Sequence, residues 1–110
     1  MQRLTSWSLI LILLFSVATA VTADEVVVVE MSAFKFIPED LTIKRGTTVR
    51  WVNKEKRQFH SIWFREAGEE PGEYLFPGDS YERKFDTVGV FPYVCQPHMD
   101  HMRGVIRVVE

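Results

Sequence analysis

Residues 93–104 read Tyr93-Val94-Cys95-Gln96-Pro97-His98-Met99-Asp100-His101-Met102-Arg103-Gly104. The eight residues from Cys95 to Met102 offer a thiol, an imidazole and a thioether, and they lie between two runs that favour β-strands. Soft sulfur ligands select copper, and a plane of two histidines and one cysteine with a weak axial methionine suits electron transfer. The segment therefore predicts a copper-binding loop between two strands.

The second histidine of such a plane must come from elsewhere in the chain. The sequence has three histidines, and His60 is the only one outside the loop. We therefore predict that His60, Cys95 and His98 hold one copper ion per chain. The loop itself offers three candidates for the axial position, which are Met102, Met99 and His101.

Two other kinds of site use the same residue types. Structural zinc sites usually combine several thiolates in paired spacings such as C-x2-C, and this chain has the single cysteine Cys95. A cysteine nucleophile with a histidine base would make an enzyme, but nothing in the sequence indicates an oxyanion hole or a substrate pocket. A free cysteine can also be an inert buried residue. The combination with the histidines and methionines favours copper binding without catalysis.

The remainder of the chain reads as short strands separated by turns. No segment keeps a helical period over about eleven residues. Gly, Pro, Asn and Asp interrupt the β-prone runs, which favours an all-β fold, an antiparallel Greek-key β-sandwich. The expected strands are 26–29, 41–43, 47–52, 80–85, 90–94 and 104–109.

The first residues resemble a secretory signal peptide. Arg3 precedes an apolar run from Leu9, and small residues follow, so cleavage is expected after Ala23 or after Ala20. The apolar run is shorter than the roughly 20 residues that span a bilayer. We expect residues 1–23 to be a signal peptide and residues 24–110 to form one exported domain that is not inserted in a membrane.

The charge of that domain argues against nucleic acid as a partner. Removal of residues 1–23 takes away only Arg3 among the charged residues, which leaves 12 basic and 15 acidic side chains. Residues 66–73 predict an acidic surface loop, and Lys54, Lys56 and Arg57 make a basic patch. Either is a candidate docking surface, or simply a solvated turn.

Two longer stretches resemble one known family. Residues 36–53 are similar to the run F-x-P-x-x-L-x-V-x-x-G-x-x-V-x-W-x-N, and residues 89–98 are similar to G-x-Y-x-Y-x-C-x-P-H. Both belong to the small type 1 copper proteins of the cupredoxin family, the amicyanin, pseudoazurin and plastocyanin group. The resemblance implies a cupredoxin-like sandwich with His60, Cys95, His98 and Met102 as copper ligands.

The same resemblance implies a function. The chain is expected to be a periplasmic, monomeric one-electron carrier that docks transiently with redox partner proteins near His98. The chain departs from the family in two places. Ser61 follows His60 where the family usually has asparagine, and Met102 follows His98 at a spacing between those of amicyanin-like and plastocyanin-like loops. A periplasmic protein for copper tolerance or delivery is therefore the alternative function.

Overall fold

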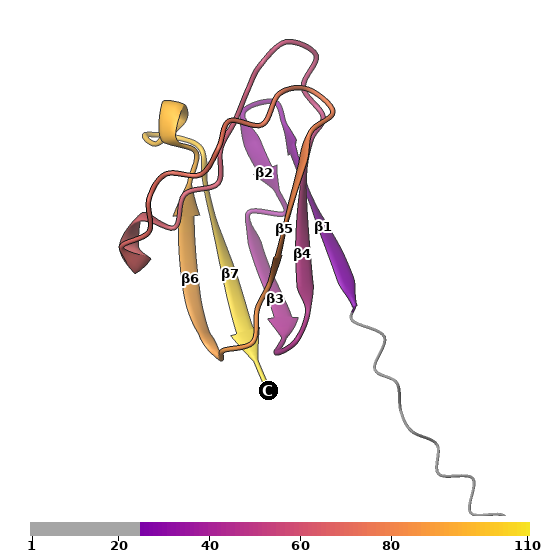
Figure 1. The fold of residues 1–110 in the computed structure, drawn as a ribbon, viewed down its shortest axis with the longest axis vertical. Helices are drawn as coiled ribbons and strands as arrows, with labels where there is room; N and C mark the ends of the chain where they lie inside the picture. The colour runs from indigo at the N-terminus through magenta and orange to yellow at the C-terminus, as the bar shows by residue number, and fades with distance from the viewer. Residues whose placement is uncertain (1–24) are drawn as a thin grey trace, which may run out of the picture.

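The computed structural model describes residues 25–110, and the expected signal peptide lies outside these residues. The described chain is built from strands and two short 3-10 turns, which confirms the all-β prediction (Figure 1). The elements are β1 (Val26–Ser32), β2 (Lys35–Ile37), β3 (Asp40–Lys44), β4 (Thr48–Asn53), η1 (Arg65–Ala67), β5 (Ser80–Lys84), β6 (Gly89–Val94), η2 (Gln96–His98) and β7 (Arg103–Val109). The sequence did not predict β2, because three residues are too few to show an alternating pattern.

The strands form two sheets that pack as a sandwich (Figure 1). One sheet has the order β2-β1-β4-β5 and the other has the order β3-β7-β6. The β1–β2, β4–β5 and β6–β7 pairs are antiparallel, as expected, whereas the β1–β4 and β3–β7 pairs are parallel. A parallel pair needs a crossover connection. The chain makes one by passing from β1 through β3 in the opposite sheet before it returns as β4.

Alternating side chains from both sheets fill the space between them. In β4, Val49 and Trp51 are buried whereas Arg50 is exposed. The Trp51 ring lies between the sheets, with its centroid 5.5 Å from that of Tyr93 and 6.1 Å from that of Phe64. Large aromatic rings in close contact give such a core most of its buried apolar area. The sandwich is thus a fixed support for the loops at its ends.

Both segments that carry predicted ligands leave the sandwich at the same end. β4 ends at Asn53, β6 ends at Val94 and β7 begins at Arg103, all at the upper end in Figure 1. The long connection from β4 to β5 is tied down by two isolated bridges, His60 with Leu75 and Trp63 with Val94. Residues 66–73, which begin within η1, are all exposed and form a surface loop, as predicted. Within residues 25–110, no helix is long and apolar enough to cross a bilayer.

Candidate metal centre

Three predicted ligands come together at this end of the sandwich. One potential ligand atom from each of His60, Cys95 and His98 lies within 4.8 Å of the other two. The Cys95 Sγ atom is 3.6 Å from Nδ1 of His60 and 3.5 Å from Nδ1 of His98. Atoms that bind one metal ion through bonds of about 2.0–2.3 Å are separated by roughly 3.3–4 Å. The spacing and the chemistry of these donors therefore fit a single metal ion.

His60 is held from two sides. Its backbone pairs with Leu75, with N–H···O distances of 3.0 and 2.7 Å, and its ring is fully buried. The Nε2 atom lies 3.2 Å from Oε1 of Glu55. An ionised carboxylate can only accept hydrogen bonds, so Nε2 carries the proton and the lone pair of Nδ1 faces Cys95. This is the tautomer that a metal ligand requires.

Glu55 is held in place by the backbone of a neighbouring hairpin. The Phe34 N–H donates to Glu55 Oε1 at 2.9 Å, and the Glu55 N–H donates to Oδ1 of Asn53 at 2.9 Å. The hydrogen bond from Phe34 lowers the pKa of Glu55, and the bond to His60 acts in the same direction against partial burial. Glu55 therefore stays ionised beside His60.

Ser61 connects the two ligand segments. Its backbone N–H donates to Sγ of Cys95 at 3.4 Å, and its Oγ accepts a hydrogen bond from the Gln96 N–H at 3.0 Å. Ser61 replaces the asparagine of the family motif, and its shorter side chain still braces one segment against the other.

The thiol of Cys95 is fully buried. Burial raises its pKa, and the backbone N–H groups of Ser61 and His98 act in the opposite direction. A thiol in this environment is protonated without metal and loses its proton on metal binding.

The loop that carries Cys95 and His98 closes on itself. The Cys95 N–H donates to the Met102 carbonyl at 3.0 Å, and the Met102 N–H donates to the His98 carbonyl at 2.8 Å. The pKa of the His98 imidazole is lowered by partial burial first and then by the nearby rings of His60 and His101. The lowered pKa favours the neutral form of the imidazole. Because the side chain is only half-buried, it is also partly accessible from outside.

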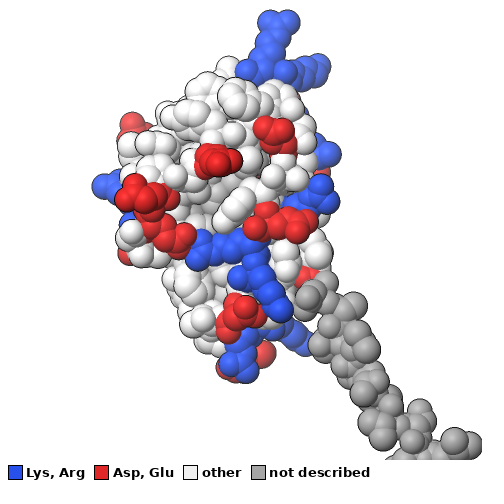
Figure 2. All heavy atoms as spheres, viewed as in Figure 1, with Lys and Arg blue, Asp and Glu red and all other residues white. Residues whose placement is uncertain are grey.

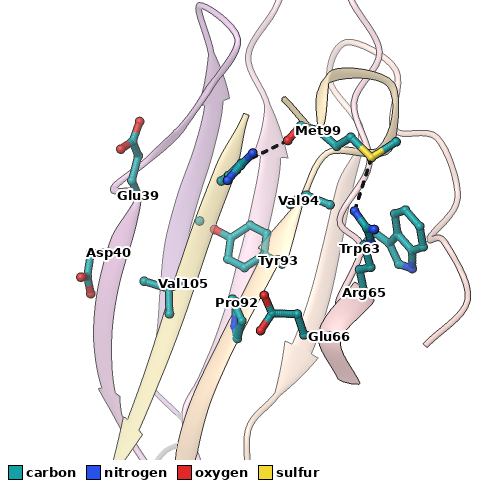
Figure 3. Close-up of a pocket in the computed structure, with 12 residues that line it drawn as sticks. Glu39, Asp40, Trp63, Arg65, Glu66, Pro92, Tyr93, Val94, Met99 and Val105 are labelled. Atoms are coloured by element: carbon teal, nitrogen blue, oxygen red, sulfur yellow. Dashed lines mark hydrogen bonds between the residues drawn. The ribbon is translucent and has the colours of Figure 1, made fainter. Parts of the chain in front are cut away.

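The three axial candidates occupy different surroundings. Met102 is fully buried. Met99 is 38% exposed, and its Sδ atom contacts Nη1 of Arg65 at 3.8 Å (Figure 3). His101 is exposed, with its ring centroid 5.8 Å from that of His98. Met99 and His101 thus belong to the surface, whereas Met102 lies inside.

Two residues near the site were not found by the sequence analysis. Glu55 stood within a basic stretch and gave no separate signal. Phe34 follows Ala33 in the β1–β2 turn, and both have a left-handed backbone, with φ of 58° and 52°. The Phe34 ring lies edge-on against the imidazoles of His60 and His98, with centroid distances of 5.8 and 5.0 Å. The Phe34 ring therefore covers one side of both imidazoles with apolar surface.

One hollow on the described surface is separate from this cluster. It has a volume of about 690 Å³ and lies between β3, β6, β7 and η1. Figure 3 shows Met99 at the top of its lining, Arg65 below Met99 on the right and Tyr93 near the centre. Its lining does not include His60, Cys95 or His98. The candidate metal ligands are therefore not part of the wall of this hollow.

Comparisons with known proteins agree with this geometry. Residues 5–108 match the cupredoxin-like domain model. The chain is 40% identical over 90 residues to plastocyanin from Scenedesmus fuscus, covering 72% of this chain and 91% of that protein. It is 35% identical to amicyanin from Paracoccus versutus, covering 84% and 71%.

Solved structures give the same relationship. A reduced mutant of amicyanin superposes with a TM-score of 0.71 at 31% identity, covering 79% of this chain and 85% of that one. The resemblance drawn from residues 36–53 and 89–98 is confirmed. The chain belongs to the family of cupredoxin-like domains.

Proposed function

We propose that this protein is a one-electron carrier with one copper ion held by His60, Cys95, His98 and Met102. The observation that supports it most is the meeting of one buried thiol and two imidazole Nδ1 atoms at 3.5–3.6 Å. Two histidines and one cysteine with a weak axial methionine are the ligands of blue copper electron-transfer sites. A related amicyanin structure is described as a Cu(I) form.

The residues around the site suit a carrier better than an enzyme. Four protein donors leave no open position for a substrate. Glu55 and Leu75 fix His60, and the loop hydrogen bonds fix Cys95, so these donors would move little if a bound copper ion changed its oxidation state. The partly exposed His98 is the ligand that a partner can approach, beside the exposed Pro97 and Met99.

The cellular location that we propose rests on the signal-peptide pattern of residues 1–23 and on the family of the chain. Residues 1–23 act as a secretory signal and residues 24–110 are exported to the periplasm as a monomer. Transient complexes with redox partner proteins form near His98, with a buried area below roughly 1,200 Å² that favours rapid release.

Copper tolerance or delivery is the second candidate. The observation that favours it is the exposed pair Met99 and His101 beside His98, which could receive copper at the surface. Deletion of the gene separates the two roles. A growth defect confined to high copper would support tolerance or delivery rather than electron transfer.

Visible absorption and EPR spectra of the Cu(II)-loaded protein test the main proposal. We expect an intense thiolate-to-copper band that ascorbate bleaches reversibly. The band should vanish in Cys95→Ser and change its position or intensity in Met102→Leu. A stable but colourless copper complex would contradict an electron carrier and favour storage or delivery.

A further inference from the structure

Three aromatic rings form an exposed cluster close to the candidate metal centre. Phe59, Tyr74 and Phe76 are 36%, 48% and 56% exposed. The ring centroid of Phe59 lies 4.8 Å from that of Tyr74 and 5.9 Å from that of Phe76. Single exposed apolar residues are normal, whereas clustered ones indicate an interaction site. We call these three residues the aromatic triad.

The triad lies on the outer face of the segments that hold His60. Neighbouring residues in an extended chain point to opposite sides. His60 and Leu75 are buried and paired through their backbones, so the flanking triad residues face outward. The Asn53 side chain donates to the Leu75 carbonyl at 2.8 Å and to the Gln58 carbonyl at 2.9 Å. These bonds fix the triad relative to the metal ligands.

A basic loop lies directly beside the triad. Lys54, Lys56 and Arg57 are exposed, and none of them forms an ion pair with another residue of the 25–110 range. Glu55 in the same loop turns inward to His60 and Phe34. Figure 2 shows blue side chains at the upper tip, above a mostly white surface, with red side chains lower down. The tip is thus locally positive in a chain whose formal net charge is −2.

The acidic loop at 66–73 is less suitable as a docking surface for this site. Glu69 is neutralised by Arg83 through two hydrogen bonds of 2.8 and 2.9 Å. In Figure 1 this loop lies to the side of β6, below η2, and not at the tip. The basic loop, by contrast, is bonded through Glu55 to Phe34, whose ring is 5.0 Å from that of His98.

We propose that the basic loop 54–57 and the aromatic triad form the docking surface for an acidic redox partner protein. This inference rests on the proposed electron-transfer function. Carboxylates of the partner are steered by Lys54, Lys56 and Arg57, and an apolar part of its surface packs on the triad. Complementary charge accelerates encounter, and apolar contact holds the short-lived complex.

The charge part is tested by reversing three cations in Lys54→Glu/Lys56→Glu/Arg57→Glu. Stopped-flow rates are measured with reduced plant-type ferredoxin as the acidic probe and with cytochrome c as the basic probe, over a range of ionic strength. With ferredoxin we expect the wild-type rate to fall as salt rises. The variant should be slower by about tenfold or more at low salt, with a flat or reversed salt dependence.

The matched control reverses three exposed cations at the opposite end, in Lys44→Glu/Arg45→Glu/Lys84→Glu. It changes the net charge equally and should keep the wild-type preference for ferredoxin. Equal losses in the two triple variants would mean that only net charge matters and would overturn the proposal, as would wild-type rates that ignore salt.

The aromatic part is tested by Tyr74→Ser/Phe76→Ser at high salt, where charge steering is screened. We expect the rate with ferredoxin to fall several-fold while its salt dependence is retained. Val90→Ser, at a site that is 60% exposed on β6, is the control and should have no effect. An unchanged rate in the double variant would remove the triad from the docking surface.

Two further measurements keep the outcomes distinct. Absorption spectra before and after ascorbate report the metal site itself, so a wild-type protein that does not bleach would contradict the proposed function and not the docking surface. Sedimentation velocity reports self-association. A dimer that the triple variant at the tip dissociates would assign this surface to a second copy of the chain and overturn the proposal.

Discussion

The two histidines of the candidate metal centre are held in contrasting ways. His60 is fully buried, its backbone is paired with Leu75 and its Nε2 atom is bonded to Glu55. His98 lies in a short loop and is half-buried, with the Phe34 ring covering one side. The difference indicates that the His60 side fixes the geometry, whereas the His98 side is where another molecule can approach.

The largest expected effect comes from removing each imidazole in turn, by His60→Gly and His98→Gly. Loss of an outer hydrogen-bond partner alone lowers metal affinity about 10–100-fold, so loss of a ligand should cost more than about 100-fold. Both variants should lose the intense absorption of the copper-loaded protein. Added imidazole should restore most of it in His98→Gly, because that position reaches solvent, but little in His60→Gly. Equal rescue would show that the two positions are equally accessible.

Gly104→Ala tests the packing of β7 on Tyr93, next to the loop that carries His98. A Cβ atom at this position would lie 2.4 Å from Cζ of Tyr93, whose ring is buried against Phe36 and Trp51. Overpacking of this kind costs about 1–3 kcal/mol. We expect the free energy of unfolding to fall by that amount in denaturant titrations of the metal-free protein. The control is Val105→Ala, at a half-buried position of the same strand, β7. A substitution at Gly46 would not serve as a control, because its positive φ would itself strain any other residue. A loss no greater than that of the control would show that the Tyr93 ring moves freely.

Glu55→Gln tests the hydrogen bond between Glu55 and the ring of His60. The variant keeps the shape of the side chain but removes its charge. Hydrogen bonds to charged groups contribute about 1.5–3 kcal/mol, so we expect a loss of about 1 kcal/mol or slightly more, because the amide retains one acceptor. Chemical denaturation of the metal-free variant measures it. Glu39→Gln, an exposed carboxylate, should change stability little. A Glu55 effect as small as that control would contradict the role assigned to this carboxylate.

The same variant gives a pH dependence with a definite sign. The pKa of Glu55 in the folded protein lies below its ordinary value of 4.5, so its contribution is fully present above pH 4.5. It is lost as the pH falls below that value through the folded pKa. The difference in stability between wild type and Glu55→Gln should therefore shrink in this acid range. A difference that stays constant there would contradict the shift.

Met99→Leu should have the smallest effect. Its sulfur contacts only Arg65 among the hydrogen-bond partners found in residues 25–110, and its side chain is exposed. Surface changes of this kind usually alter stability by less than about 0.5 kcal/mol. The visible spectrum of the copper-loaded protein should stay as in wild type, in contrast to Met102→Leu. A changed spectrum would indicate that Met99 is an axial ligand.

Much of the metal centre was predictable because its donors are chemically distinctive. Cys95 is the only cysteine and His60 is the only histidine outside the loop, so the sequence left one choice for each. The supporting residues had no such signal. Phe34 and Glu55 are ordinary residue types whose role depends on a hairpin turn and a loop meeting in space, over a separation of 21 residues.

Most of the strands, the donor residues and the membership of the family could be predicted from the sequence, because local alternation and residue chemistry depend on neighbouring positions. Three features became visible only in the folded chain, namely the parallel pairing of β1 with β4, the exposure of Met99 in contrast to the burial of Met102, and the outward orientation of the aromatic triad. Each of these depends on how distant segments pack together. The sequence shows which residues alternate between polar and apolar, but the packing of the strands determines which residues contact one another.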